Sequence, residues 1–130
     1  MLMFSSTTDN IKVIVETAFK MEQNQLSSSD FLFAYRVSIE NYSENTIQLL
    51  RRHWFIVESN GLRREVEGIG VLGEQPIITP SDFHQYTSYC NIKSEFGKMY
   101  GYFTMLRTKD GSTFKIAIPE FKMAVPYRLN

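Results

Sequence analysis

The sequence predicts an all-β protein, an antiparallel β-sandwich of immunoglobulin or fibronectin III type with about seven or more strands. Aromatic residues make up 14% of the chain, and such side chains suit the half-buried surface of a sheet. Apolar and polar residues alternate in several runs, which is typical of strands with one buried face. Turn residues separate these runs at short intervals, as in sandwiches and barrels. An open barrel is the alternative architecture.

Length and composition define the class of protein. A chain of 130 residues has the size of one domain, and we divide it into a flexible N-terminal tail over residues 1–8 and one domain over residues 9–130. Fourteen basic residues balance fourteen acidic ones, which argues against nucleic-acid binding through excess positive charge. The sequence shows neither a signal peptide nor the ~20-residue apolar run of a membrane helix. We therefore expect a cytoplasmic protein without membrane insertion.

The first strands are predicted from alternation. Ile11, Val13 and Val15 alternate with polar residues and indicate a strand. After a polar loop at residues 21–30 comes the clearest strand of the chain, in which every second residue is large and apolar. Its buried face is expected to contain Phe31, Phe33, Tyr35, Val37 and Ile39.

Turn residues place the next elements. A long strand is predicted from Thr46 to about Glu58. The pair Asn60-Gly61 indicates a hairpin, because both residues tolerate positive φ, and residues 62–66 form the return strand. Residues 68–80 contain three glycines and two prolines, so we expect a loop there with at most a short strand at residues 69–72.

The last part of the chain is also predicted to be strands. Residues 83–92 and 99–108 form two of them, and Asp110-Gly111 indicates a second hairpin. In the strand that follows, Pro119 is expected to end the pairing. The predicted core is completed by Trp54, Phe103, Ile116 and Ile118.

The glycines Gly68, Gly70 and Gly73 fit the pattern G-x-G-x-x-G. In dinucleotide-binding proteins this pattern joins a strand to a helix whose amides face the pyrophosphate. Pro76 and Pro80 follow too soon for such a helix, so we interpret the glycines as tight turns and close strand crossings. We predict no useful affinity for NAD or FAD. Weak phosphate or pyrophosphate binding by loop amides and nearby arginines stays open.

Strand alternation predicts which arginines point inward and which point outward. If Leu50 and Trp54 point inward, Arg52 also points inward and needs a carboxylate partner. The candidates for that partner are Glu65, Glu67 and Glu74. Arg51 and Arg64 are then expected to face outward, where guanidinium groups could bind phosphate or an acidic partner.

Tyr100 and Tyr102 alternate with Met99, Gly101, Phe103 and Met105. If the second set belongs to the core, the two tyrosines form an exposed, amphipathic face of the kind found in recognition surfaces. The alternatives are a second core face or isolated surface aromatics. Gly101 between the tyrosines suggests a bulge or the close approach of another backbone.

The residue types of catalytic and metal sites are scarce. His53 and His84 are the only histidines and Cys90 is the only cysteine, too few for a closed transition-metal site. Each histidine is expected to be exposed or hydrogen-bonded, and Cys90 to be buried and inert. Without a nucleophile elbow or a base near Ser88, we predict no enzyme activity, no cofactor and no transition metal. A Mg²⁺ ion held by one carboxylate and several waters stays open.

Several motifs resemble those of the ApaG family, in order along nearly the whole chain from about Asp9. They are Leu50-Arg51-Arg52-His53-Trp54, Asn60-Gly61, the run from Gly68 to Pro76, Tyr86-Thr87-Ser88, the run from Gly97 to Tyr102, Ile118-Pro119-Glu120-Phe121, Pro126 and Asn130. Ser81 stands where the family commonly has glycine, and Leu72 where valine is usual. The altered residue after Pro80 affects the expected shape of that turn.

The resemblance implies a fibronectin III-like sandwich, usually a free-standing bacterial protein. Related domains are appended to a eukaryotic F-box protein and to a DNA-polymerase-interacting protein, which implies a binding role. Members are often labelled cobalt/magnesium efflux proteins and are associated with a diadenosine-tetraphosphate hydrolase. We therefore predict a non-catalytic module that binds a protein partner or a phosphate-bearing ligand, with an indirect link to cobalt/magnesium homeostasis. The alternative is an enzyme or sensor acting on a nucleotide or pyrophosphate.

Overall fold

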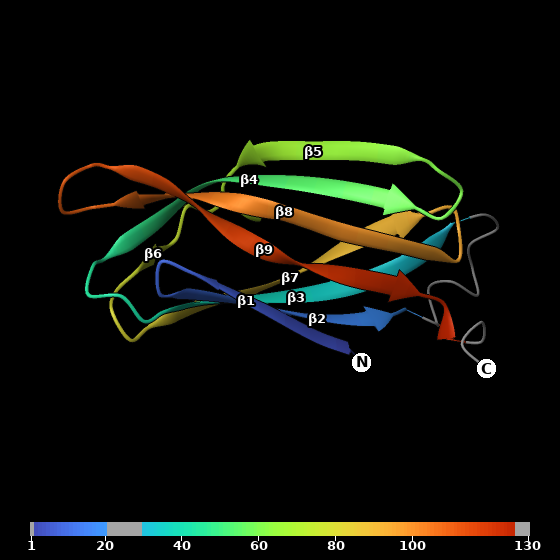
Figure 1. Ribbon diagram of the computed structural model, residues 1–130, viewed down its shortest axis with the longest axis horizontal. Helices are drawn as coiled ribbons and strands as arrows, with labels where there is room; N and C mark the ends of the chain where they lie inside the picture. Colours follow the sequence, from blue (N-terminus) through green and yellow to red (C-terminus); the bar gives the residue numbers. More distant parts are fainter. Residues whose placement is uncertain (1, 21–29, 127–130) are drawn as a thin grey trace.

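The computed structural model describes residues 2–20 and 30–126 and confirms the antiparallel β-sandwich (Figure 1). The predicted loop at residues 21–30 lies outside the described residues except for Asp30. One sheet has the order β1 (Leu2–Thr8), β2 (Ile11–Phe19), β3 (Phe31–Asn41) and β7 (Phe83–Ile92). The other has the order β5 (Arg63–Ile69), β4 (Ile47–Glu58), β8 (Phe96–Arg107) and β9 (Thr113–Ala124), with β6 (Ile77–Ile78) paired to β4.

The core lies between the two sheets. Every predicted core residue is buried except Phe31, which is partly buried and packs against the others. Trp54 lies at the centre of an aromatic group, with its ring 5.4 Å from Tyr35, 5.8 Å from Phe121 and 6.3 Å from Phe103. Of these three edge-to-face contacts, the one with Tyr35 joins the two sheets, whereas Phe103 and Phe121 belong to the same sheet as Trp54.

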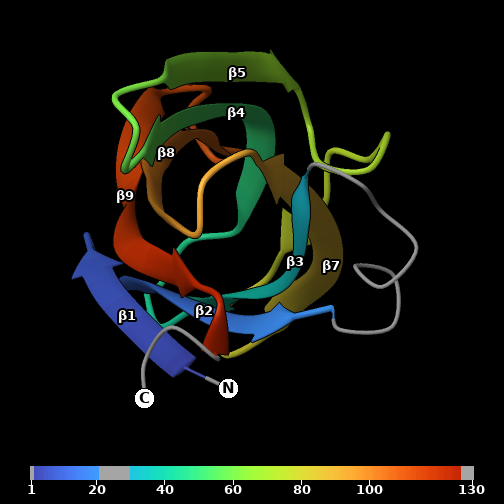
Figure 2. The same cartoon turned by 90° about the vertical axis from the view of Figure 1, so that its right-hand side faces the viewer.

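β1 and β9 close the sandwich along one side (Figure 2). The Ser6 hydroxyl donates a hydrogen bond to the Ala117 carbonyl at 2.9 Å, and the Ala117 amide donates to the Thr8 hydroxyl at 3.2 Å. The other two edges, β5 and β7, have no strand beyond them among the described residues.

The prediction of a flexible tail over residues 1–8 is wrong for residues 2–8, and residue 1 lies outside the described residues. β1 pairs with β2 in register from Leu2 opposite Thr17 to Thr8 opposite Ile11. Asp9 and Asn10 have φ values of 49° and 63°, the left-handed conformation that a two-residue hairpin turn requires. Residues 5–8 are small and polar, but together with residues 2–4 they add a complete strand to the sheet.

Pro119 does not end the last strand as predicted, because β9 continues to Ala124. The register between β8 and β9 shifts between Met99 and Gly101, so Pro119 and Glu120 lie opposite the single residue Tyr100. Proline has no amide hydrogen to donate, and a bulge is one of the places in a sheet that tolerates this loss.

The strand lengths differ from the predictions around the glycine-rich segment. β5 extends to Ile69 rather than ending at Val66, and the short strand β6 lies at Ile77–Ile78 rather than at residues 69–72. Both predicted hairpin turns are present, and their glycines have positive φ: 91° at Gly61 and 74° at Gly111.

Glu58 at the end of β4 holds the turn between β7 and β8. Its carboxylate is buried and accepts hydrogen bonds from the Lys93 amide at 2.6 Å and the Ser94 amide at 3.0 Å. We expect Glu58→Ala to lower the free energy of unfolding by about 2–3 kcal/mol, because two backbone donors lose their acceptor. Urea unfolding measures this loss. Glu44→Ala, at an exposed glutamate, should change stability by less than about 0.5 kcal/mol, and an equal loss in both variants would contradict the role of Glu58.

Candidate functional site

Aromatic rings form two stacked pairs on the outer face of the sheet that contains β4 and β8. Tyr100 stacks on Phe55 at 5.2 Å and 19°, and Tyr102 stacks on His53 at 4.9 Å and 24°. His53 and Phe55 also stack on each other, at 4.8 Å. All four side chains are half-buried, whereas Met99, Phe103 and Met105 on the opposite side of β8 are buried. The two tyrosines therefore lie on an amphipathic outer face. The aromatic row is defined here as His53, Phe55, Tyr100 and Tyr102.

The His53 ring is hydrogen-bonded on both nitrogens. Nε2 lies 2.8 Å from the Glu65 carboxylate, and Nδ1 lies 3.2 Å from Glu67 and 3.1 Å from the Tyr102 hydroxyl. This confirms the expectation of a hydrogen-bonded imidazole. The sequence did not indicate this group, because its members come from three neighbouring strands, β4, β5 and β8. The contacts fix the ring in the plane in which it stacks on Tyr102.

Gly101 allows the backbones of β8 and β4 to approach closely. A Cβ atom at this position would lie 2.0 Å from the His53 carbonyl oxygen. The register shift opposite β9 lies at the same place, so both features suggested by Gly101 are confirmed. The approach occurs where His53 pairs with Tyr102, at the centre of the aromatic row.

Charged residues flank the aromatic row. On the side of β8 and β9, the Lys115 ammonium lies 4.5 Å from the Tyr102 ring centre, and Lys98 lies 6.0 Å from the Tyr100 ring centre. Lys98 also forms an ion pair with Glu120 at 3.4 Å. On the side of β5 lie the exposed carboxylates of Glu65 and Glu67. Lysines therefore border the aromatic row on the side of β8 and β9, and two glutamates border it on the side of β5.

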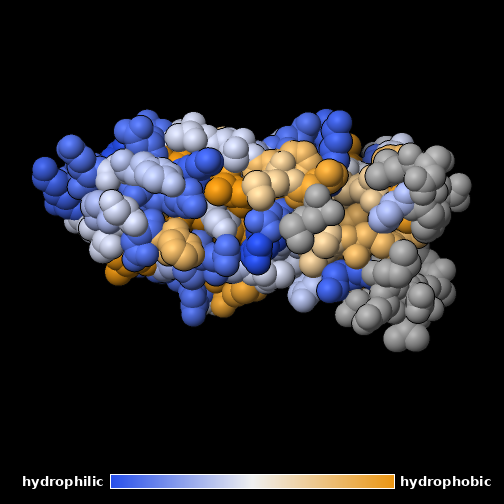
Figure 3. Space-filling view, turned by 90° about the horizontal axis from the view of Figure 1, so that it is seen from below, coloured by the Kyte–Doolittle hydropathy of each residue, from blue (hydrophilic) through white to orange (hydrophobic). Residues whose placement is uncertain are grey.

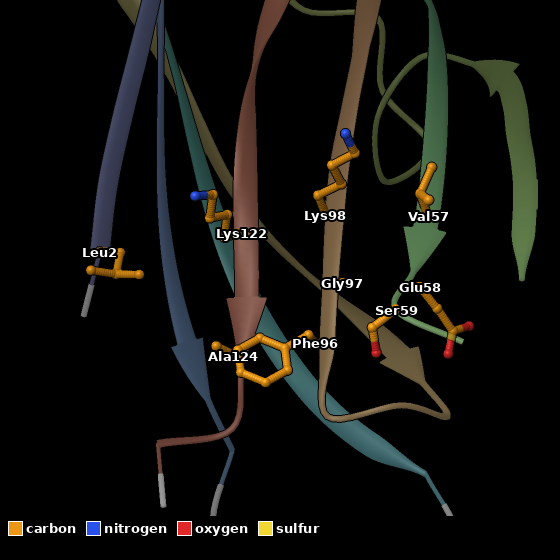
Figure 4. A pocket seen from close by; sticks show the side chains of 9 residues that line it. All are labelled: Leu2, Val57, Glu58, Ser59, Phe96, Gly97, Lys98, Lys122 and Ala124. Atoms are coloured by element: carbon orange, nitrogen blue, oxygen red, sulfur yellow. The ribbon is translucent and has the colours of Figure 1, made fainter. Parts of the chain in front are cut away.

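An apolar groove of about 540 Å³ continues this face toward the ends of β4, β8 and β9 (Figure 4). Phe96 and Ala124 lie side by side in it, at the start of β8 and the end of β9. Phe96 is 44% exposed although it is a large apolar residue. We call this the Phe96 groove; it is lined by Leu2, Val57, Glu58, Ser59, Phe96, Gly97, Lys98, Lys122 and Ala124.

Apolar side chains also gather on the neighbouring surface. Seen from below, one half of the molecule is mostly hydrophilic, whereas apolar residues cluster in the other half (Figure 3). Leu2 and Met3 of β1 are 49% and 66% exposed. Leu2 belongs to the wall of the Phe96 groove, so the strand that the sequence did not predict contributes to this surface.

The structure does not bring Arg51 and Arg64 together. Arg51 is exposed and has the same strand parity as His53, on the outer face. Arg64 reaches across to the other sheet, where it donates hydrogen bonds to the Asn91 carbonyl and to the Cys90 sulfur at 3.5 Å. The expectation that both arginines face outward is wrong for Arg64. Arg64 pairs with Ile56 on β4, and the side chains of both residues point to the inner side of the sheet.

Arg52 points inward as predicted, but its partners are not carboxylates. Its Nη1 donates to the carbonyl oxygens of Ile69 at 3.1 Å and Gly70 at 2.9 Å. Glu65 and Glu67 instead face His53 on the outer side of the sheet. Leu50 does not share the inward parity, because a bulge between Leu49 and Arg51 places Leu49 in the core.

The three glycines of the G-x-G-x-x-G pattern serve backbone geometry. Gly68 lies against the Arg52 guanidinium, which would be 3.0 Å from an added Cβ. Gly70 has a φ of 65°, and an added Cβ would lie 2.1 Å from the Glu74 carbonyl oxygen. Leu72 and Gly73, with φ values of 48° and 78°, form a tight turn closed by two hydrogen bonds between Val71 and Glu74. The chain continues to β6 and not to a helix.

Cys90 is buried, and burial raises the pKa of its thiol to about 11, although the nearby Arg64 guanidinium opposes part of the shift. The folded state therefore favours the neutral thiol. This contribution to stability is complete below the unfolded pKa near 9 and is lost as the pH rises toward 11. We expect urea unfolding to show a steeper fall of stability between pH 9 and 11 for the natural protein than for Cys90→Ala. Parallel curves for the two proteins would contradict the shift.

Two kinds of feature are absent from the described residues. No cluster of three or more histidine, cysteine, aspartate or glutamate side chains there could hold a metal ion. In the same part of the chain, no helix has the length and apolar character needed to cross a bilayer.

The fold and the outer face define a small β-sandwich with an aromatic surface. A family model described as the ApaG domain matches residues 21–107. The chain is 44% identical to the protein ApaG of Pseudomonas paraeruginosa, in an alignment that covers 97% of this chain and 99% of that protein. It is 43% identical to ApaG of Paramagnetospirillum magneticum, covering 98% and 100%. The protein belongs to the ApaG family.

Solved structures agree with this assignment. The crystal structure of a putative ApaA protein from Bordetella pertussis superposes with a TM-score of 0.85 at 32% identity, covering 92% of this chain and 97% of that one. A structural-genomics X-ray structure gives a TM-score of 0.83 at 38% identity, covering 90% and 88%.

Proposed function

We propose that this protein is a non-catalytic binding module that recognises a partner protein through the outer face of the β4–β8 sheet. The observation that carries the proposal is the continuity of the aromatic row with the Phe96 groove. Tyr100 and Val57 belong to the same outer face, and Lys98 borders both surfaces. Half-exposed aromatic rings beside an apolar groove with a charged rim are the usual composition of a protein-binding surface.

The charges of this face select the partner. Lys98 and Lys122 line the groove, and Lys115 covers the neighbouring Tyr102 ring. We infer a partner segment that places an apolar side chain in the Phe96 groove and acidic side chains next to these lysines. Within this proposal, the link to cobalt and magnesium homeostasis that the family resemblance implies acts through the bound partner.

Comparative affinity capture from a lysate of the source organism tests the proposal. Phe96→Asp places a negative charge in the groove, and Tyr100→Ala removes one ring of the aromatic row; each should lose the same protein that the natural chain retains. Tyr42→Asp is the matched control, because Tyr42 is 64% exposed and lies outside the groove and the aromatic row. Retention of every captured protein by Phe96→Asp and Tyr100→Ala would contradict the proposed surface.

A further inference from the structure

A second candidate site lies between the two sheets, away from the outer face. The edge strands β5 and β7 leave a cleft there, formed by two adjoining cavities of about 420 Å³ and 290 Å³. The two cavities share Tyr35, Arg52, Trp54 and Ser88. We propose that this inter-sheet cleft binds a carboxylate, carried by a small organic acid or by the C-terminus of a peptide, and that Arg52 and the Tyr86 hydroxyl hold it.

Arg52 provides a fixed positive charge in the middle of the cleft. The carbonyl oxygens of Ile69 and Gly70 both accept from Nη1, and the guanidinium lies against Gly68. Among the described residues, no salt bridge pairs Arg52 with a carboxylate. A partly buried cation without a counter-ion is costly, and a bound anion would remove that cost. The backbone contacts orient the guanidinium before the ligand arrives.

Tyr86 provides a donor without an acceptor. The residue is 9% exposed, and its hydroxyl is fully buried without a hydrogen-bond partner in the described part of the chain. Burial raises the pKa of this phenol, so it keeps its proton at neutral pH, and the Arg52 charge opposes part of the shift. Burial also raises the pKa of the neighbouring Tyr35 phenol. Since buried polar groups are almost always paired, the unpaired Tyr86 hydroxyl, on the same cavity as the Arg52 guanidinium, is suited to donate to an anionic ligand.

The geometry favours a carboxylate over a phosphate. One guanidinium matches one negative charge and can bind a planar carboxylate with two parallel hydrogen bonds. The second arginine at the cleft, Arg64, lines only the larger cavity, whereas Leu72 and Tyr86 line the smaller one. Arg64 also donates a hydrogen bond to the Asn91 carbonyl, so it does not add a second charge beside Tyr86. The Trp54 and Tyr35 rings offer apolar walls to the rest of the ligand. The cavity volumes are at the lower end of the range for small-molecule sites.

Titration with benzoate, followed by amide chemical shifts in ¹H–¹⁵N spectra, tests the proposal. We expect shifts at Val71, Leu72, Gly73 and Ser88 that saturate with benzoate. Tyr86→Phe and Arg52→Lys should each weaken binding about tenfold or more, the usual effect of losing a hydrogen bond to a charged group. Arg51→Lys, on the outer face, should leave the affinity unchanged.

Thermal unfolding separates loss of binding from loss of the fold. Tyr86→Phe removes an unpaired buried hydroxyl, so its melting temperature should equal or exceed that of the natural protein. If Tyr86 had only a structural role, Tyr86→Phe would not weaken benzoate binding while leaving the melting temperature unchanged. If Tyr86→Phe and Arg52→Lys both bind benzoate as tightly as the natural protein does, the proposal is overturned.

Two further titrations identify the ligand class. The first compares a short apolar peptide with a free C-terminus with the same peptide amidated. If the protein binds benzoate but not the free peptide, the ligand is a small organic acid. If it binds the free peptide more strongly than the amide, the ligand is a peptide C-terminus. Inorganic phosphate at the same concentration should bind more weakly than either carboxylate. Tighter binding of phosphate, or no shift with benzoate and the free peptide, would refute the carboxylate site.

Discussion

Replacing Trp54 with alanine should lower the free energy of unfolding by about 3–5 kcal/mol. The indole is 3% exposed and contacts the rings of Tyr35, Phe103 and Phe121. Removing it leaves a cavity between two sheets that the surrounding strands cannot fill by collapse, because each strand is fixed by its neighbours. A loss of this size approaches the whole stability of an ordinary domain.

Urea unfolding followed by circular dichroism measures the loss at Trp54. Tyr42→Ala serves as the control, because it removes an aromatic ring that is 64% exposed, and it should change stability by less than about 0.5 kcal/mol. A loss below about 1 kcal/mol at Trp54 would show that the indole does not hold the sheets together as the structure describes.

Gly101→Ala should cost about 3 kcal/mol or more, because no small rotation relieves the contact that it creates. The added methyl group would lie 2.0 Å from the His53 carbonyl oxygen and 3.1 Å from the Trp54 Cα atom, and both are backbone atoms of β4. The strands must separate locally, which breaks ladder hydrogen bonds at the centre of the sheet and strains the core.

Gly111→Ala is the matched control for Gly101→Ala. Gly111 has a φ of 74° and no atom within 4 Å of an added Cβ, so its substitution costs only the backbone strain, about 1 kcal/mol. Thermal and urea unfolding should therefore rank Gly101→Ala as much the more damaging of the two variants. The reverse order would show that the two strands do not approach so closely.

The sequence predicted the elements whose signals are local. Alternation over residues 31–39 located β3 and its buried face, and Asn60-Gly61 and Asp110-Gly111 located two hairpins. A third local signal, Asp9-Asn10, also marks a hairpin turn, but the small polar residues before it concealed β1. Those residues form a strand because β2 supplies the pairing and β9 supplies partners for Ser6 and Thr8.

The errors come from effects that involve more than one strand. A bulge in β4 changed the parity on which the prediction for Leu50 relied, and a bulge opposite Tyr100 accommodated Pro119. Each bulge depends on how neighbouring strands pair, which alternation within one strand cannot reveal.

The candidate sites were predicted less completely than the fold. The tyrosine face was recognised because its alternation lies within β8, whereas the carboxylates around His53 come from β5. Carboxylates were predicted to pair with Arg52, but carbonyl oxygens do so instead. The Phe96 groove combines the ends of β4, β8 and β9, neighbours in one sheet, with Leu2 from β1 of the other sheet. These arrangements follow from sheet order and register, which the sequence did not specify.

The most direct test of the proposed binding module is photo-crosslinking from the groove itself. A photoreactive p-benzoylphenylalanine replaces Phe96 in one protein and Tyr42 in another, and each is irradiated in a lysate of the source organism. We predict one defined crosslinked product from position 96, abolished by excess unlabelled natural protein but not by excess Phe96→Asp, and no such product from position 42. Identical products from both positions, or a product at position 96 that Phe96→Asp also abolishes, would contradict recognition through the outer face.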